Sequence, residues 1–83
     1  MAAYSLFFRK SVEGDLARIP KRDVARIVER ILALAEDPRP RGCEKLSSQE
    51  RYRVRQARYR IVYSIQDEQL TVWVVKVGYR RDV

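Results

Sequence analysis

The chain has 83 residues, of which 46% are apolar and 35% charged, a balance that excludes a wholly disordered protein and indicates one small folded domain over residues 1–83. Its formal net charge is +7, and 14 of its 18 basic residues are arginine. Because the planar arginine fork matches phosphate and carboxylate, this excess predicts a polyanion or an acidic protein as partner.

Histidine is absent, which excludes nucleases that depend on a histidine pair or triad. Cys43 is the single cysteine, so it can form no internal disulfide, and we interpret it as a small loop residue instead of an activated nucleophile. We expect no metal and no cofactor. No apolar run reaches membrane-spanning length and residues 1–4 do not resemble a signal peptide, so we expect a cytoplasmic protein without membrane contact.

The first elements along the chain are a strand and a short helix. Residues 4–8 form an apolar run without glycine or proline, which is typical of a strand. Ser11 is expected to be the N-cap of a short helix with one apolar stripe. Pro20 separates this helix from the next one, since proline is tolerated in a first turn but not inside a helix.

The second helix is predicted over residues 21–36, where apolar residues recur at three- and four-residue spacing. Arg22, Arg26 and Arg30 stand four residues apart on another face of it. We interpret them either as a solvated helix face or as a stripe that contacts nucleic acid. The connection that follows starts with two prolines and a glycine, and Leu46 is expected to hold it against the core.

Residues 51–63 alternate arginine with bulky side chains, which predicts a β-hairpin whose tight turn is Ala57 and Arg58. Residue 55 then pairs with 60, and residue 52 with 63. Because side chains alternate along a strand, the arginines gather on one face and the bulky residues on the other. The tyrosines of the bulky face are interpreted as core, with base stacking as the alternative. The bulky face is expected to hold Tyr52, Val54, Tyr59, Ile61, Tyr63 and Ile65, and the basic face Arg53, Arg55 and Arg60.

The last strand is predicted over residues 70–77, which are apolar on both faces and therefore central in the sheet. We prefer the register with Thr71, Trp73, Val75 and Val77 inward, because it places Lys76 beside the arginines instead of burying it. The order strand, helix, helix, strand, strand, strand predicts an α+β fold (βααβββ) with both helices on one face of an antiparallel sheet. The other face is left open and basic.

The basic face allows two kinds of function. Its cations suit a phosphodiester backbone, so one function is RNA binding without chemistry. The other is RNA cleavage, in which a 2′-hydroxyl attacks the adjacent phosphate while arginines stabilise the developing charge. Arginine is a poor general base, which leaves tyrosine or lysine for proton transfer, so the residues alone favour binding over catalysis.

Four motifs stand out: the Asp37-Pro38 helix exit, Tyr52-Arg53-Val54-Arg55, Tyr59-Arg60-Ile61-Val62-Tyr63 and Val77-Gly78-Tyr79-Arg80-Arg81-Asp82-Val83. Together with the order of elements they resemble the RelE/ParE toxin superfamily, and its RelE branch more closely. The resemblance covers essentially the whole chain. It implies a toxin of a type II toxin–antitoxin pair that cleaves mRNA in the ribosomal A site, inhibits translation and is neutralised by an acidic, RelB-like antitoxin.

By position, the resemblance makes Arg60 a catalytic arginine that contacts phosphate and Arg80 a second one that stabilises the transition state. Tyr79 stands where relatives carry histidine or lysine, and it is a third catalytic candidate if its phenol points into the basic face. Relatives also continue past Val83 into a catalytic tyrosine, so we expect this chain to be a weakened ribonuclease. The residues expected to bind RNA are Arg53, Arg55, Arg58, Lys76, Arg81, Arg22, Arg26 and Arg30.

Two alternatives belong to other functional classes. One is gyrase inhibition through protein–protein contact, as in ParE-like toxins, and the other is an RNA-binding module without catalysis. The basic residues on the two hairpin strands favour the RelE-like interpretation over the ParE-like one.

Overall fold

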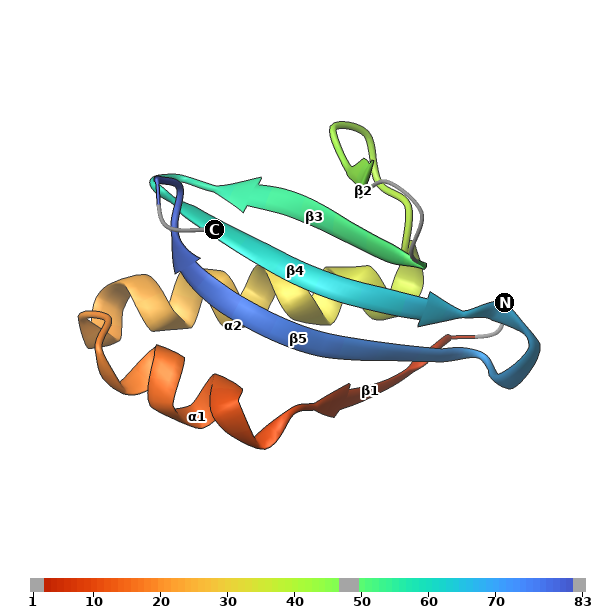
Figure 1. Cartoon of the computed structure of the whole chain (residues 1–83), viewed down its shortest axis with the longest axis horizontal. Coiled ribbons are helices and arrows are strands. Elements are labelled where there is room, and N and C mark those ends of the chain that lie inside the picture. The colour runs from red at the N-terminus through yellow and green to blue at the C-terminus, as the bar shows by residue number, and fades with distance from the viewer. Residues whose placement is uncertain (1–2, 47–49, 82–83) are drawn as a thin grey trace.

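The structure is a computed structural model and describes residues 3–46 and 50–81. Residues 47–49, near the end of the predicted connection before the hairpin, and Asp82-Val83 of the C-terminal motif lie outside the described residues. Figure 1 shows the elements in chain order. They are β1 (Ser5–Phe8), α1 (Lys10–Ala17), α2 (Lys21–Glu36), β2 (Glu44–Leu46), β3 (Arg51–Gln56), β4 (Tyr59–Gln66), the 3₁₀ turn η1 (Asp67–Gln69) and β5 (Thr71–Tyr79).

The strands form one mixed sheet in the order β1-β5-β4-β3-β2. The predicted α+β fold is confirmed, but β1 pairs with β5 in parallel, which corrects the expectation of a wholly antiparallel sheet. Figure 1 shows the reason: α1 carries the chain onward from β1, α2 returns it, and the meander of β3, β4 and β5 leaves β5 running in the direction of β1. A parallel pair needs such a crossover between its strands.

β2 is a second difference from the sequence prediction, which assigned residues 44–46 to a loop. These residues pair antiparallel with the start of β3, with Glu44 opposite Arg53. Gly42 precedes β2 with a φ of +90°, a left-handed conformation that favours glycine. Leu46 is half-buried opposite Arg51 on the open face of the sheet, so the expectation that it holds this segment against the core is wrong; Cys43 packs against the core instead.

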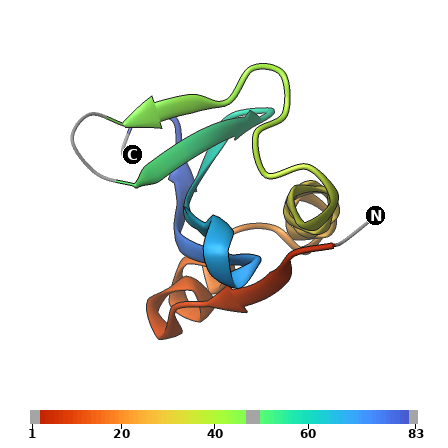
Figure 2. The same ribbon diagram turned by 90° about the vertical axis from the view of Figure 1, so that its right-hand side faces the viewer.

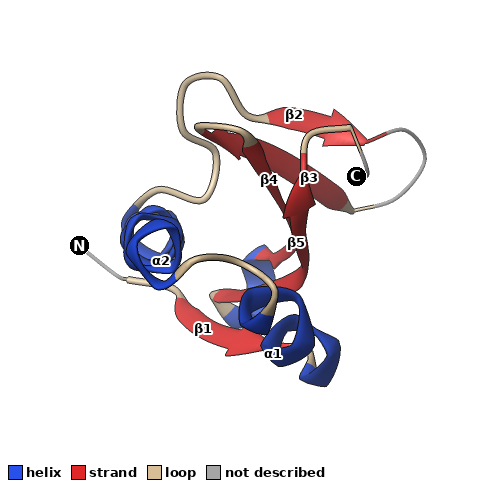
Figure 3. Cartoon of the chain, turned by 90° about the vertical axis from the view of Figure 1, so that its left-hand side faces the viewer, coloured by secondary structure: helices blue, strands red, loops and turns tan. Residues whose placement is uncertain are grey.

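The longer helix, α2, spans the predicted residues and buries Ile27, Ile31 and Leu34. Figures 2 and 3 look along the molecule from its two ends and show α2 against one side of the curved sheet. The shorter helix, α1, begins at Lys10 with Arg9 as its N-cap, so the predicted Ser11 cap is wrong. The cause is that Arg9 is still extended, so the chain passes from β1 into the helix before it reaches Ser11.

The helix α1 protects part of the edge of β5. The pairing of β1 with β5 ends where Phe8 lies opposite Val74, so the rest of β5 has no strand on that side within the described residues. The Asp15 carboxylate of α1 accepts a hydrogen bond of 3.1 Å from the Val77 N–H. A free strand edge is thereby capped by a side chain instead of being left open to another chain.

The β3–β4 hairpin has the predicted register, with Arg55 opposite Arg60 and Tyr52 opposite Tyr63. All six residues of the predicted bulky face are buried. The Tyr63 hydroxyl donates to the Pro38 carbonyl at 2.7 Å, which ties the exit of α2 to the centre of the sheet. The hairpin tyrosines are therefore core residues, as predicted, and do not serve as stacking surfaces for bases.

A β-bulge divides β5 into two halves. On β4, Val62 lies opposite Lys76, and the next residue, Tyr63, lies opposite Val74, so Val75 is an extra residue on β5. Because one extra residue shifts the alternation of side chains, the two halves of the strand follow different registers.

The preferred register is therefore right for the second half of β5 and wrong for the first. Val77 is buried and Lys76 is exposed, as predicted. In the first half the core takes Val72 and Val74, whereas Trp73 lies on the opposite, open face of the sheet.

Candidate functional site

The face of the sheet turned away from α2 carries a group of cations that we call the basic cluster. The hairpin places Arg55 and Arg60 directly opposite each other on this face. The Arg80 backbone N–H donates to the Arg58 carbonyl at 2.8 Å, which ties the end of β5 to the hairpin turn. The sheet thus brings the arginines of the hairpin together with those that follow β5. The basic cluster consists of Arg53, Arg55, Arg60, Lys76 and Arg80.

The charges of the basic cluster repel one another. Burial of the Arg60 guanidinium lowers its pKa most, and the neighbouring charges of Arg53, Arg55 and Arg80 lower it further. The group stays protonated at neutral pH, because an ordinary arginine pKa is above ~12. Like charges held directly across a sheet are unfavourable, so a bound anion would relieve this repulsion.

Glu44 on β2 is an acidic side chain in contact with the basic cluster. Its Oε1 accepts a hydrogen bond of 2.9 Å from Arg53 Nε. This bond, and then the charge of Arg53, lower the pKa of Glu44. Exposed pairs of this kind contribute little, so an incoming phosphate can replace the carboxylate. Glu44 is not among the residues predicted from the sequence, since a three-residue strand gives no readable alternation from which to pair it with Arg53.

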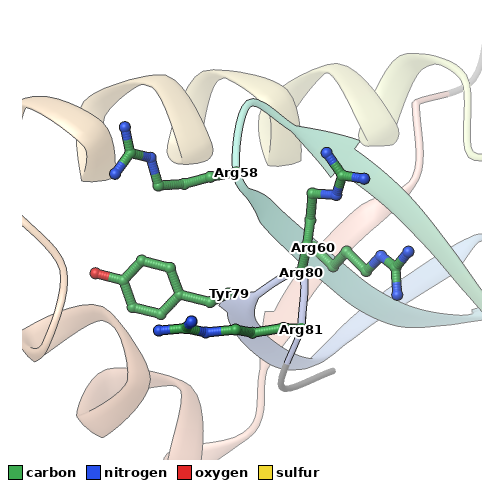
Figure 4. A pocket seen from close by; sticks show the side chains of 5 residues that line it. All are labelled: Arg58, Arg60, Tyr79, Arg80 and Arg81. Atoms are coloured by element: carbon green, nitrogen blue, oxygen red, sulfur yellow. The ribbon is translucent and has the colours of Figure 1, made fainter.

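A shallow pocket of about 720 Å³ lies at the end of the basic cluster, where β4, the hairpin turn and the end of β5 meet. Its lining is cationic apart from one phenol, which suits an anionic ligand. Figure 4 shows these side chains, and the structure brings together both predicted catalytic arginines here. The lining residues are Arg58, Arg60, Tyr79, Arg80 and Arg81.

Tyr79 lies in the pocket wall with its phenol turned away from the two arginines. In Figure 4 the Tyr79 ring and the Arg81 side chain extend to one side, and the guanidinium groups of Arg60 and Arg80 to the other. The Tyr79 ring packs on Tyr59, with 5.1 Å between ring centroids. Tyr59 in turn donates to Asp23 Oδ2 at 2.5 Å, and this bond, with burial, raises its pKa to about 12. Tyr79 thus continues the core side of the sheet.

The three helix arginines lie apart from the basic cluster. Arg22, Arg26 and Arg30 belong to α2, which packs on the opposite face of the sheet. The side chains of Arg22 and Arg26 are exposed, and Arg30 is half-buried beside Tyr63. Burial raises the pKa of Tyr63, and the charge of Arg30 opposes that rise. An RNA strand bound on the open face would therefore not reach these three arginines, although they were predicted to bind RNA together with the arginines of the hairpin.

Two further observations concern what the described part of the chain contains. Within residues 3–46 and 50–81, no three histidine, cysteine, aspartate or glutamate side chains gather as a possible metal site. In the same ranges, no helix has the length and apolar character needed to cross a membrane.

Comparison with known proteins identifies the family. Residues 6–83 match the family model described as ParE toxin of type II toxin-antitoxin system, parDE. None of the curated proteins compared with this chain matches it. Among solved structures, the toxin–antitoxin complex RelBE2 from Mycobacterium tuberculosis shares 30% identity with a TM-score of 0.85, covering 96% of this chain and 94% of that chain.

Two other solved structures share the fold over nearly their whole length. The archaeal RelE–RelB complex from Pyrococcus horikoshii has 26% identity and a TM-score of 0.85, covering 98% of this chain and 99% of that one. The intact RelBE complex from E. coli has 23% identity and a TM-score of 0.81, with 93% and 96% covered. The family match and the structural similarity agree: the chain belongs to the RelE/ParE superfamily of toxins from type II toxin–antitoxin systems.

Proposed function

We propose that this protein is a ribosome-dependent mRNA endoribonuclease that inhibits translation in the cytoplasm and is neutralised by an acidic, RelB-like antitoxin. The observation that carries this proposal is the convergence of Arg60 and Arg80 in one pocket at the end of the basic cluster. A surface with this density of arginine favours a substrate whose charge is negative and grows during the reaction.

The reaction is an attack of the 2′-hydroxyl of a nucleotide on its own 3′-phosphate. The hydroxyl loses its proton, the bond from phosphorus to the 5′-oxygen breaks, and that oxygen gains a proton. Negative charge accumulates on the phosphate oxygens between these events. Arg60 and Arg80 are assigned to those oxygens, where donors already in place cost no reorganisation during the reaction. Arg53, Arg55 and Lys76 are assigned to the neighbouring phosphates.

Proton transfer is the weak part of this site. Tyr79 stands in the pocket wall, but its phenol extends away from Arg60 and Arg80. A positioned acid or base ordinarily contributes ~10²–10⁴-fold, and the arginines cannot act as one because they stay protonated. We therefore assign the rate to orientation and charge, and the two proton transfers to water or to groups of the substrate complex.

Dependence on the ribosome follows from the same geometry. The pocket is shallow and the basic cluster lies on an open sheet, so the protein alone does little to hold a flexible mRNA in line for attack. An mRNA held in a ribosomal site has already lost much of its conformational freedom, and such pre-organisation is worth a large part of a reaction barrier.

The antitoxin is proposed to lay acidic residues against Arg60 and Arg80. Complementary charge would speed the encounter of the two proteins and cover the pocket at the same time. The similar structures named above are complexes of RelE-type toxins with RelB-type antitoxins, which supports a partner of this kind.

The alternative is gyrase inhibition, which is favoured by one observation: the matching family model is described as a ParE toxin. Two assays on the same preparation separate the functions. Primer extension on mRNA in programmed ribosomes should reveal new 5′ ends only when the protein is added, and gyrase supercoiling should proceed unchanged. Inhibited supercoiling with intact mRNA would support the gyrase alternative and overturn the proposal.

A further inference from the structure

An aromatic pair lies on the open face of the sheet, outside the basic cluster. Phe7 on β1 lies beside Trp73 on β5, with 5.1 Å between ring centroids and 26° between ring planes. Phe7 is 47% exposed and Trp73 is half-buried. The core side of this part of β5 is filled by Val72 and Val74, so the aromatic pair is not needed to complete the core.

Trp73, but not Phe7, also lines a small hollow with mixed chemistry. The hollow has a volume of about 360 Å³ and opens beside the end of β1. Cationic groups for phosphate, neutral groups that hydrogen-bond to base edges, and a flat ring for stacking are the elements of single-stranded RNA recognition. All three are present, since the hollow is lined by Phe8, Arg9, Lys10, Ser64, Gln66 and Trp73.

A row of side chains connects this hollow to the basic cluster. Arg51 lies opposite Ser64, and Ser64 lies opposite Trp73, so these residues stand side by side across three strands. Arg51 is also the open-face neighbour of Arg53 along β3, two residues away. The positive surface therefore continues from the basic cluster up to the aromatic pair.

The hollow is separate from the pocket of Arg60 and Arg80. Arg60 and Ser64 are four residues apart on β4, which at the rise of an extended strand is about 13 Å. This length corresponds to a short stretch of single-stranded chain, so one RNA molecule can occupy both places.

We propose that the open face holds a second RNA subsite, in which a base stacks on the Phe7–Trp73 pair and the adjoining phosphate contacts Arg9 and Lys10. This rests on the proposed function for the identity of the RNA as mRNA. The strand runs from the pocket along the row of Arg51 and Ser64, so the second subsite anchors the chain a short distance from the scissile phosphate, while the ribosome aligns that phosphate for attack. Stacking is tolerant of base identity, so this subsite selects single-stranded character over sequence.

Trp73 is the only tryptophan of the chain, so its emission reports on the subsite without any label. We would titrate the protein with a 2′-O-methyl oligouridylate, which cannot be cleaved because it has no free 2′-hydroxyl. Saturable quenching of Trp73 emission is expected. Inorganic polyphosphate has the charges but no bases, and it should bind and compete without quenching. No oligonucleotide binding, binding without a change in emission, or equal quenching by polyphosphate would each overturn the proposal.

A matched pair of variants tests the contribution to affinity. Phe7→Ala removes one exposed ring and should weaken oligonucleotide binding at least about fivefold, the lower end of what one stacked base contributes. Leu32→Ala removes an exposed apolar side chain of α2 on the other side of the molecule and should leave binding unchanged. Far-ultraviolet circular dichroism of both variants confirms folding, and the wild-type quenching result stands even if Phe7→Ala fails to fold.

The outcomes also separate this proposal from the proposed function and from a protein-docking surface. Ribosome-dependent cleavage with silent Trp73 emission would refute the subsite and leave the nuclease function standing. Quenching without any cleavage would support the subsite and refute the nuclease. A co-purified antitoxin that shields Trp73 from acrylamide, combined with no response to the oligonucleotide, would show that a protein covers this face and would overturn the subsite.

Discussion

The basic cluster sets how strongly salt should weaken RNA binding. Each neutralised phosphate of a single strand releases counterions and contributes a slope of about −0.7 to the dependence of log affinity on log salt concentration. Glu44 offsets the charge of Arg53, so we assign one neutralised phosphate to each of the other four cations of the basic cluster, which are Arg55, Arg60, Lys76 and Arg80. For an oligoribonucleotide too short to reach Arg9 and Lys10, the expected slope is therefore about −2.8, so affinity should fall about 50-fold between about 50 and about 200 mM salt.

Single substitutions should move this slope in opposite directions. Arg55→Ala removes one exposed contact and should bring the slope to about −2.1, whereas Glu44→Gln releases Arg53 and should bring it to about −3.5. Arg22→Ala is the matched control, because Arg22 is exposed on α2 behind the sheet. Fluorescence anisotropy of a labelled, non-cleavable oligoribonucleotide across a salt series measures all four proteins. A slope near zero, or an Arg22→Ala slope reduced as much as that of Arg55→Ala, would refute binding on the open face.

Two ionisable groups give further predictions about stability. Asp67 accepts from Arg39 at 2.8 Å and from the Tyr4 hydroxyl at 2.8 Å, and these bonds lower its pKa to about 2. Because this pKa lies below the value of about 4 in the unfolded chain, ionised Asp67 stabilises the fold above pH ~4, and this stabilisation is lost as pH falls toward 2. The free energy of unfolding in urea should therefore fall over this pH range in the wild type by more than it falls in Asp67→Asn. Tyr59, with its pKa raised to about 12, stabilises the fold below pH ~10 and loses this effect as pH rises through 12. Absorbance of tyrosinate should show a late component from Tyr59 that Asp23→Asn shifts to lower pH, and an unshifted curve would disprove the role of the Tyr59–Asp23 bond.

The hairpin could be predicted from sequence because one short stretch contains all the information that fixes it. Arginine alternates with bulky residues on both sides of Ala57, whose φ of +54° makes the turn. A shift of one residue would bury arginines and expose tyrosines, so the register has one acceptable solution. The bounds of α2 could be predicted for a similar reason, because apolar residues recur at regular spacing over all sixteen residues of the helix.

The parts that escaped prediction depend on contacts between distant segments. β1 and β5 are adjacent in the sheet but lie at opposite ends of the chain, and their parallel pairing follows from the path of the helices between them. The bulge at Val75 is hidden in a strand that is apolar on both faces, where Lys76 marks the solvent side of the second half but no charged residue marks it in the first half. These two features together place Trp73 beside Phe7 on the open face, which periodicity along either strand alone could not reveal.

In the candidate site, too, the residues of one short stretch could be predicted, whereas those that depend on contacts between distant segments could not. Arg53, Arg55 and Arg60 were grouped correctly because they belong to one hairpin. The direction of Tyr79 depends on where β5 resumes its alternation after the bulge, and this turns the phenol toward Tyr59. Glu44 depends on the pairing of a three-residue strand that only the folded sheet defines.

The measurement that tests the central claim most directly is the rate of mRNA cleavage in programmed ribosomes by wild-type protein, Arg60→Ala, Arg60→Lys and Arg22→Ala. Removal of one donor that stabilises transition-state charge ordinarily costs ~10²–10³ in rate, and Arg60→Ala should lose about that much. Arg60→Lys should recover only part of the loss, because lysine keeps the charge but not the bidentate fork. Arg22→Ala should cleave at the wild-type rate. Equal cleavage by wild-type protein and Arg60→Ala, with both bound to the ribosome, would contradict the account.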